Sequence, residues 1–256
     1  MILWVDGAHE PRENMRRDEL LLGTAESAAQ APPVLRLFRF APPGITLGRG
    51  QDPARVLDLA RCARDGVPWA LRPTGGRATF HDQEWTYSFA ASLAHPDGAG
   101  SIAETYARLS WLIVRSLERL GVPAALAPGS HVARAEAGGA LAPCFASTAR
   151  HEIVLEGRKL VGSAQRRTAR ALLQQGSLLL GKGHERLADY LAVGPSEREG
   201  IRAALRASAA HAGALLGSEA PLHRWADALI EVLPGATLRI EGEAGLSLAA
   251  AEPVGA

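Results

Sequence analysis

Two side chains in this sequence could carry covalent or proton-transfer chemistry, those of Lys159 and Cys144. The chain has 28 lysines and arginines together, but only Lys159 and Lys182 are lysines. Arginine stays protonated, whereas a lysine amine can be desolvated, lose its proton and act in a reaction. Lys182 is interpreted as a lysine kept by chance. Small residues beside Lys159 leave room for a substrate: Gly162, Ser163 and Ala164.

Cys144 lies in residues 123–147, a stretch rich in Ala, Gly and Pro that predicts a long loop. Loops of that length in a compact domain are usually functional or mobile. A lone cysteine is more often an inert packed residue than a nucleophile. A lysine brought close by folding changes that balance, because a neighbouring ammonium favours the thiolate. Cys144 and Lys159 are therefore a candidate reactive pair.

The stretch LRPTGGRATFHD, residues 71–82, places Gly75 and Gly76 in a turn. Adjacent glycines let a backbone approach a ligand and aim its N–H groups at an oxygen or phosphate, although most such pairs are ordinary turns. His81 and Asp82 could suggest a metal site or a catalytic dyad, but adjacent strand residues point to opposite faces. We therefore interpret His81 as a structural hydrogen-bonding residue.

The elements that must position these residues alternate between helix and strand without an internal repeat. A helix is expected over residues 14–30, before Pro32, and Ser101 with Glu104 predicts a capping box for a helix over 102–120. Strands are expected at 34–40, 44–49, 69–73, 78–82, 84–92, 151–156, 158–167 and 171–180, hairpin-like around the glycine turn, and a short helix at 53–64 with a buried Cys62.

The segment after residue 185 predicts helices over 185–193, 196–211 and 221–233, then a strand pair at 236–240 and 246–250. The length of 256 residues fits one large domain with at most a small appendage. A net charge of +1 gives no nucleic-acid signature. No signal peptide or membrane-spanning stretch is recognised, so we expect a cytoplasmic protein with free thiols.

Two long motifs together resemble the lipoate-protein ligase and octanoyltransferase family. LRPTGGRATFHDQEWTYSF is similar to its arginine, Thr/Ser-Gly-Gly and His-Asp signature, and GRKLVGSAQRR with LLQQGSLLL to its lysine strand. NMRRDELLL and ITLGRGQD are also similar, so the resemblance spans about residues 14–180. It implies an α+β fold of the biotin/lipoate ligase type, with a mixed, mostly antiparallel sheet and flanking helices. Residues 1–256 would form a single catalytic domain with an extension from about 185 and no large accessory domain.

The resemblance also implies an activity. Members attach an eight-carbon acyl or lipoyl group to a lysine of a lipoyl domain, such as the glycine-cleavage H protein or a 2-oxoacid dehydrogenase subunit. Lys159 matches the family's lysine, and Arg72 matches a polar contact near the acyl carbonyl, with a surface ion pair as its alternative role. The residues implied to bind substrate are Arg72, Thr74, Gly75, Gly76, Arg77, His81, Gly162, Ser163, Ala164 and Gln175.

Within this family, ligases form an acyl-adenylate with ATP, whereas transferases take the acyl group from acyl carrier protein. Arg77 stands where ligases have a third glycine, and the Gly-Asn that follows His-Asp in ligases is absent. Cys144-Phe145 matches the Cys-Phe of one octanoyltransferase branch, as do TGGRA and ExTYS. Gln175 replaces a frequent histidine, and Leu71 replaces the first arginine of a usual pair.

The mechanism implied is a thiolate of Cys144 attacking an octanoyl thioester, with Gly75 and Gly76 N–H groups as donors to the tetrahedral oxygen. Lys159 favours the thiolate and later accepts a proton from the acceptor amine. An apolar tunnel should bind the acyl tail, at about 0.8 kcal/mol per buried methylene. No cofactor, metal, nucleic acid or membrane is expected. The alternatives are an ATP- and Mg-dependent ligase and a non-catalytic homologue that binds lipoyl domains or acyl groups.

Overall fold

The computed structural model of the protein describes residues 1–127, 152–233, 235 and 237–249. The described strands of its large sheet are β1 (Ile2–His9), β2 (Val34–Phe40), β6 (Glu84–Ser92), β7 (Ala125–Leu126), β8 (Ile153–Leu155), β9 (Arg158–Arg167), β10 (Ala171–Leu179) and β11 (Leu238–Glu241). Their order is β11-β1-β2-β6-β10-β9-β8-β7. Only β1 pairs in parallel, with β11 and with β2, and the other described pairings in this sheet are antiparallel. The expected mixed, mostly antiparallel sheet is confirmed.

A small second sheet carries the glycine turn. Its described strands are β3 (Gly44–Gly48), β4 (Trp69–Arg72) and β5 (Thr79–His81), in the order β4-β3-β5. The expected hairpin around the turn is wrong, because β4 and β5 flank β3 and do not pair with each other. The connection between them therefore crosses the end of β3, where a Cβ on Gly48 would collide with the carbonyl oxygen of Gly76.

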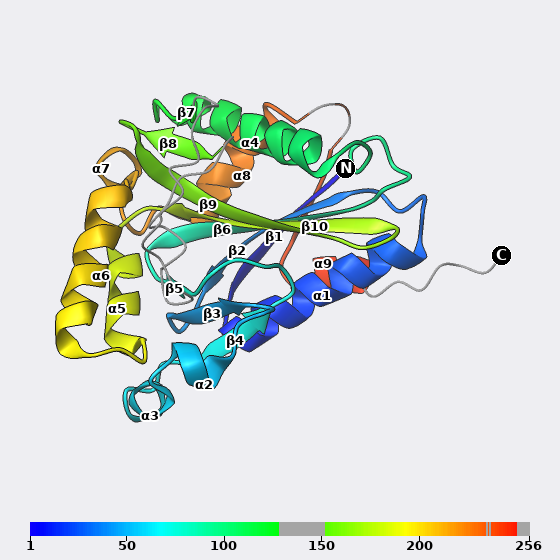
Figure 1. Ribbon diagram of the computed structural model, residues 1–256. Coiled ribbons are helices and arrows are strands. Elements are labelled where there is room, and N and C mark those ends of the chain that lie inside the picture. The colour runs from blue at the N-terminus through cyan, green and yellow to red at the C-terminus, as the bar shows by residue number, and fades with distance from the viewer. Residues whose placement is uncertain (128–151, 234, 236, 250–256) are drawn as a thin grey trace.

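Helices cover both faces of the large sheet. Helices α4 (Ile102–Arg119) and α8 (Leu222–Ile230) pack on one face, and α1 (Pro11–Ser27) lies on the other with α9 (Ala244–Ala249) beside it (Figure 1). Helix α1 begins three residues before the expected start, because a proline suits the first helical turn. The predicted capping box of α4 is confirmed, with both reciprocal hydrogen bonds present.

Apolar alternation explains which face of β6 forms the main core. Trp85, Tyr87 and Phe89 alternate along β6 and are at most 1% exposed. The ring of Trp85 stacks on that of Trp225 in α8, with centroids 5.5 Å apart. The residues between them on β6 face the opposite side of the sheet, where polar side chains gather under α1.

Several expected elements differ in the structure. The helix expected at 53–64 is two short helices, α2 (Pro53–Val56) and α3 (Leu59–Arg64), because Asp52 and Asp58 each cap a new start. Cys62 is a buried free cysteine, as predicted.

Between β10 and α8 the described chain forms the 3₁₀ helix η2 (Gly183–Arg186), α5 (Leu187–Tyr190), α6 (Pro195–Ser208) and α7 (Gly213–Leu216). The expected C-terminal strand pair is wrong. β11 pairs with β1, and residues 244–249 form the helix α9. None of the described helices is long and apolar enough to cross a membrane.

Candidate active site

A small cavity of about 40 Å³ lies between the polar face of the large sheet and the small sheet. Six of the residues predicted to bind substrate line it: Arg72, His81, Gly162, Ser163, Ala164 and Gln175. They come from β4, β5, β9 and β10, so the fold gathers segments about a hundred residues apart. The cavity is therefore the candidate acyl site.

A bulge in β9 decides where Lys159 lies. Lys159 pairs with Val154 of β8, whereas Val161 pairs with Ile153, so two steps on β9 match one step on β8. Since Ile153 and Val154 point to opposite faces, Lys159 and Val161 do too. Lys159 is consequently on the same sheet face as Gly162, a lining residue of the cavity.

The Lys159 amine is buried against a carboxylate. Its Nζ lies 2.5 Å from Oε1 of Glu152, and the two side chains are 3% and 6% exposed. Lys159 is not among the described residues that line the cavity. Glu152, which immediately precedes β8, was not predicted from the sequence. A buried ammonium needs a counter-charge, and that is the signal that could have pointed to an acid nearby.

Arg72 holds the glycine turn through hydrogen bonds to its carbonyl groups. Its guanidinium donates to the carbonyl oxygen of Gly75 from Nε at 3.1 Å and from Nη2 at 2.8 Å, and to that of Arg77 at 2.8 Å. Its Nη1 donates to Thr46. Arg72 is 7% exposed, so the alternative of a surface ion pair is wrong. The arginine anchors the carbonyls of the turn.

The backbone N–H groups of the same turn are available to a ligand. The backbone N–H groups of Gly75, Gly76 and Arg77 donate to no acceptor among the described residues. Gly76 has a φ of +96°, a left-handed conformation that favours glycine. Successive unpaired N–H groups in a turn are suited to an oxygen that carries negative charge.

His81 is held by two hydrogen bonds. Its Nε2 is 2.7 Å from Thr46 Oγ1 and its Nδ1 is 2.7 Å from Glu84 Oε1. Thr46 Oγ1 already accepts from Arg72, so its own hydrogen can go to Nε2, which fits a hydrogen on Nδ1 of His81. Both ring nitrogens are used, as expected of a structural hydrogen-bonding residue.

Asp82 does not join His81 at the cavity. Its Oδ2 accepts from Arg186 Nη1 at 3.2 Å, on the outer side of β5. The partner of His81 is instead Glu84, which was not predicted from the sequence. Its Oε1 also accepts from Thr86 and Ser177, and its Oε2 is buried without a hydrogen-bond partner among the described atoms.

Aromatic and apolar side chains complete the cavity wall. Met15 of α1 and Phe38 and Phe40 of β2 line it, and the Phe40 ring stacks on His81 with centroids 3.9 Å apart. These three residues were not predicted to belong to the site. The alternation of Phe38 and Phe40 in VLRLFRF places them on one face and was the available signal.

Ser163 is tied to the core of the molecule. Its Oγ is 2.9 Å from the hydroxyl of Tyr87, which also accepts from Gln174 Nε2 at 2.9 Å. Burial raises the pKa of Tyr87, and its hydrogen bonds with Ser163 and Gln174 only partly oppose this. The phenol therefore stays protonated and can donate to Ser163.

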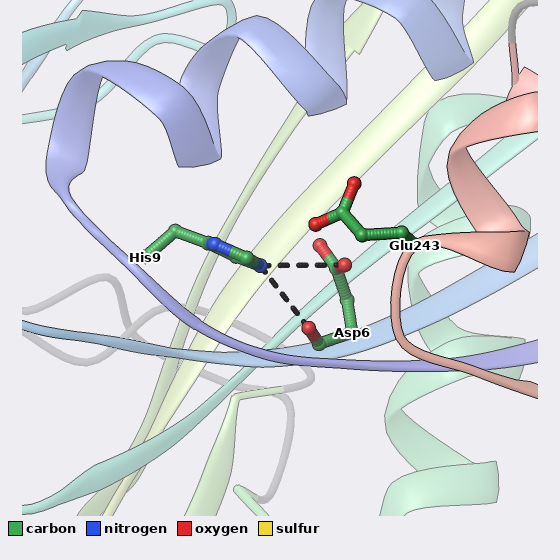
Figure 2. Close-up of side chains that lie close together, drawn as sticks. All are labelled: Asp6, His9 and Glu243. Carbon is green, nitrogen blue, oxygen red and sulfur yellow. Dashed lines mark hydrogen bonds and ion pairs between the residues drawn. The ribbon is translucent and has the colours of Figure 1, made fainter.

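Cys144 lies outside the described residues. Its distance to Lys159, and hence the reactive pair itself, stays a prediction. A separate group with metal-ligand character is formed by Asp6, His9 and Glu243 (Figure 2), none of which is among the residues that line the cavity. Arg17 already binds both carboxylates of that group at 2.6 Å, which makes it an ion-pair cluster.

Comparison with known proteins identifies the family. The lipoyl protein ligase A/B catalytic domain matches residues 10–233. The chain belongs to this family. Octanoyltransferase LipM of Kyrpidia tusciae is 37% identical over 85% of the chain and 80% of its own length. Octanoyltransferase LipM of Moorella thermoacetica is 37% identical over 80% of the chain and 73% of its own length.

Solved structures of the lipoyl protein ligase A/B family share the fold. A bipartite lipoate protein ligase from Thermoplasma acidophilum aligns with a TM-score of 0.72 and 20% identity, covering 97% of this chain and 90% of its own. A lipoate-protein ligase A bound with ATP aligns with a TM-score of 0.68 and 21% identity, over 97% of this chain and 93% of its own. The family and fold expected from the sequence motifs are confirmed.

Proposed function

We propose that this protein moves an octanoyl group from acyl carrier protein to a lysine of a lipoyl domain, through a thioester on Cys144. The observation that carries the proposal is the row of N–H groups at Gly75 to Arg77, without an acceptor among the described residues, beside a cavity whose wall includes Met15, Phe38 and Phe40. Acyl transfer needs donors for a tetrahedral oxygen next to a place for the acyl chain. The relatives named octanoyltransferase support transfer over ligation.

The first step exchanges one thioester for another. The Cys144 thiolate attacks the carbonyl carbon of the octanoyl thioester, and the oxygen that becomes negative is stabilised by the turn N–H groups. When the tetrahedral species collapses, the bond to the carrier sulfur breaks, and that sulfur takes a proton from the Lys159 ammonium and leaves as a thiol. Because a thioester is lost and a thioester is made, the step is nearly balanced in free energy.

The second step makes the amide. The amine of the acceptor lysine attacks the carbonyl carbon of the acyl-enzyme, the bond to Cys144 sulfur breaks, and an amide forms. The amine must lose a proton, and Lys159, left neutral after it protonates the carrier thiol in the first step, is the candidate acceptor for it. Amide formation from a thioester is downhill, so this step drives the transfer.

The acyl chain requires more room than the cavity offers. The cavity has a volume of about 40 Å³, whereas drug-sized ligands occupy pockets of roughly 300–1,000 Å³. Met15 is the flexible side chain in the wall, and methionine adapts its shape at low cost. Octanoyl binding should therefore move Met15, and burial of the tail contributes about 0.8 kcal/mol per methylene.

Intact-mass measurement tests the proposal. The protein is incubated with octanoyl acyl carrier protein and no ATP, and we expect an octanoyl adduct that Cys144→Ser abolishes. Cys62→Ser is the matched control, because Cys62 is buried and its burial raises the pKa of its thiol. Its variant should keep the adduct. An adduct that survives Cys144→Ser, or the lack of any adduct on the wild-type protein, would rule out the relay.

An ATP-dependent lipoate ligase is the second candidate, favoured by the fold shared with a ligase bound to ATP. It predicts modification of a lipoyl domain by free octanoate and ATP, undiminished in Cys144→Ser. In that case ATP and Mg would be required, whereas the relay needs no cofactor. A lipoyl domain that binds without any transfer would indicate the non-catalytic homologue. The carrier-protein donor and the cytoplasmic location remain predictions.

A further inference from the structure

Gln175 joins the glycine turn to helix α1 through two short hydrogen bonds. Its Oε1 accepts from Thr74 Oγ1 at 2.6 Å, and its Nε2 donates to Asp18 Oδ2 at 2.6 Å. Nε2 also lies 3.4 Å from the Met15 sulfur. Thr74 and Asp18 are fully buried, and Gln175 is 6% exposed. The link is thus shielded from water along its whole length.

Asp18 is a fixed point in the molecule. Its Oδ1 accepts from Arg36 Nη1 and from Ser88 Oγ, both at 2.6 Å. Arg36 is itself fully buried and is held by Asp6 through Nε at 2.7 Å. Strands β1, β2 and β6 therefore anchor the carboxylate to which Gln175 donates.

The two neighbours of Gln175 require one donor and one acceptor from it. Asp18 can only accept when ionised, and the Thr74 hydroxyl gives its hydrogen to Gln175. A side-chain amide meets both demands, and a neutral imidazole has one donor and one acceptor as well. Leucine has neither, and it would leave buried polar partners unsatisfied.

We propose that Gln175 is a positioning residue for acyl transfer, which holds the Thr74 end of the turn so that its N–H groups face the reacting carbonyl. This inference rests on the proposed function. Arg72 fixes the Gly75 and Arg77 carbonyls from one side, and the Asp18–Gln175 link fixes Thr74 from the other. Together they set the orientation of the peptide groups between Thr74 and Arg77.

The test removes one hydroxyl. Thr74→Val keeps the shape of the side chain but loses the bond to Gln175. We expect kcat for transfer from octanoyl acyl carrier protein to fall about tenfold or more, less than the 10²–10³ lost with an oxyanion donor itself. KM should change less than about twofold, because uniform binding is retained. The conservative variants Thr74→Ser and Gln175→His should each retain most of the wild-type kcat, because both keep the hydrogen bond between positions 74 and 175.

Amide hydrogen exchange gives a readout independent of activity. In Thr74→Val and Gln175→Leu, the amide of Arg49, which donates to the Thr74 carbonyl oxygen at 3.0 Å, should exchange faster, while those of β6 and β10 keep their protection. Thr105→Val is the matched control, a buried threonine whose hydroxyl bonds within α4 and to Gln165. In this control, the exchange of the Arg49 amide and the kcat should match those of the wild type.

Each outcome decides the proposal. Unchanged exchange of the Arg49 amide in Thr74→Val, or a kcat equal to that of the wild type, would overturn it. If kcat in Thr74→Ser and Gln175→His is as low as in Thr74→Val, the proposal is also overturned. If the wild-type protein transfers the acyl group only with ATP, the proposed function fails. Hydrogen exchange and the kcat of the ATP-dependent reaction then still test whether Gln175 positions the turn.

Discussion

At the scale of single residues, the buried pair of Lys159 and Glu152 has two roles that must be separated. The two side chains are 3% and 6% exposed, with 2.5 Å between Nζ and Oε1. Removing one partner of such a pair leaves an uncompensated charge away from water. A Lys159 variant can therefore lose activity because it loses its amine or because it loses its fold.

Lys159→Met should lower the free energy of unfolding by about 3 kcal/mol, because the buried Glu152 carboxylate then loses the ammonium that lies 2.5 Å from it. Adding Glu152→Leu should recover most of that loss, since neither charge of this pair is then buried. Urea unfolding of both variants measures the difference. Lys159→Arg keeps the charge and serves as the control. If Lys159→Met is as stable as the wild type, the pair is not desolvated.

At the scale of elements, His184 makes the packing of η2 sensitive to pH. Burial lowers the pKa of His184 from its usual 6.5, and the negative charge of the neighbouring Glu185 only partly opposes this. Unfolding releases the ring to water, where it binds a proton more readily. The unfolded state therefore gains protons over the folded state as pH falls below 6.5, and the protein loses stability.

His184→Gln should remove this dependence. The wild-type free energy of unfolding should decrease as pH falls below 6.5, with the His184→Gln variant showing a flatter profile. Chemical denaturation at pH values above and below 6.5 compares the two. His223 is exposed, and His223→Gln should retain the wild-type slope. Parallel profiles for the wild type and His184→Gln would contradict the assignment.

Elements with strong local signals were predictable from the sequence, and elements defined by distant partners were not. The capping box of α4 and the strands β2, β6 and β10 follow from nearby residues. Strand β1 was not among the expected strands, and the charged Asp6 within it is 4% exposed because distant arginines bind it. Likewise, nothing local shows that β4 and β5 pair with β3 instead of each other.

The same distinction holds for the candidate site. Arg72, His81 and Gln175 could be found by residue type within recognisable motifs, and the cavity includes them. Asp18 and Glu152 were not found, because what makes them important is a partner far along the chain or across a strand. The sequence does contain one indication of Asp18, because this residue occupies a position in the buried stripe of α1 where an apolar residue is expected.

At the scale of the whole molecule, the C-terminal segment closes the β1 edge of the large sheet and connects to the site. β11 pairs with β1, and Trp4 donates from Nε1 to the Gly242 carbonyl at 2.8 Å. Glu243 approaches Asp6 from the segment before α9 (Figure 2), and Arg17 bonds to both. Asp6 in turn holds Arg36, which holds the Asp18 that positions Gln175.

Two helical glycines test whether this closure contributes to stability. Glycine in a helix is destabilising by roughly 0.5–1 kcal/mol relative to alanine, so alanine is favourable wherever space allows. A Cβ on Gly23 in α1 would have open space around it, and Gly23→Ala should raise the free energy of unfolding by about that amount. A Cβ on Gly245 in α9 would instead collide with the Trp4 indole.

Gly245→Ala should therefore lower the free energy of unfolding, by about 1–3 kcal/mol, because the new methyl group pushes α9 away from Trp4. The opposite signs of Gly23→Ala and Gly245→Ala in one urea-unfolding series separate helix propensity from packing. Equal gains in both variants would mean that α9 does not rest on Trp4. A loss confined to Gly245→Ala would show that the sheet edge depends on the C-terminal segment, to which Arg17 also binds through Glu243.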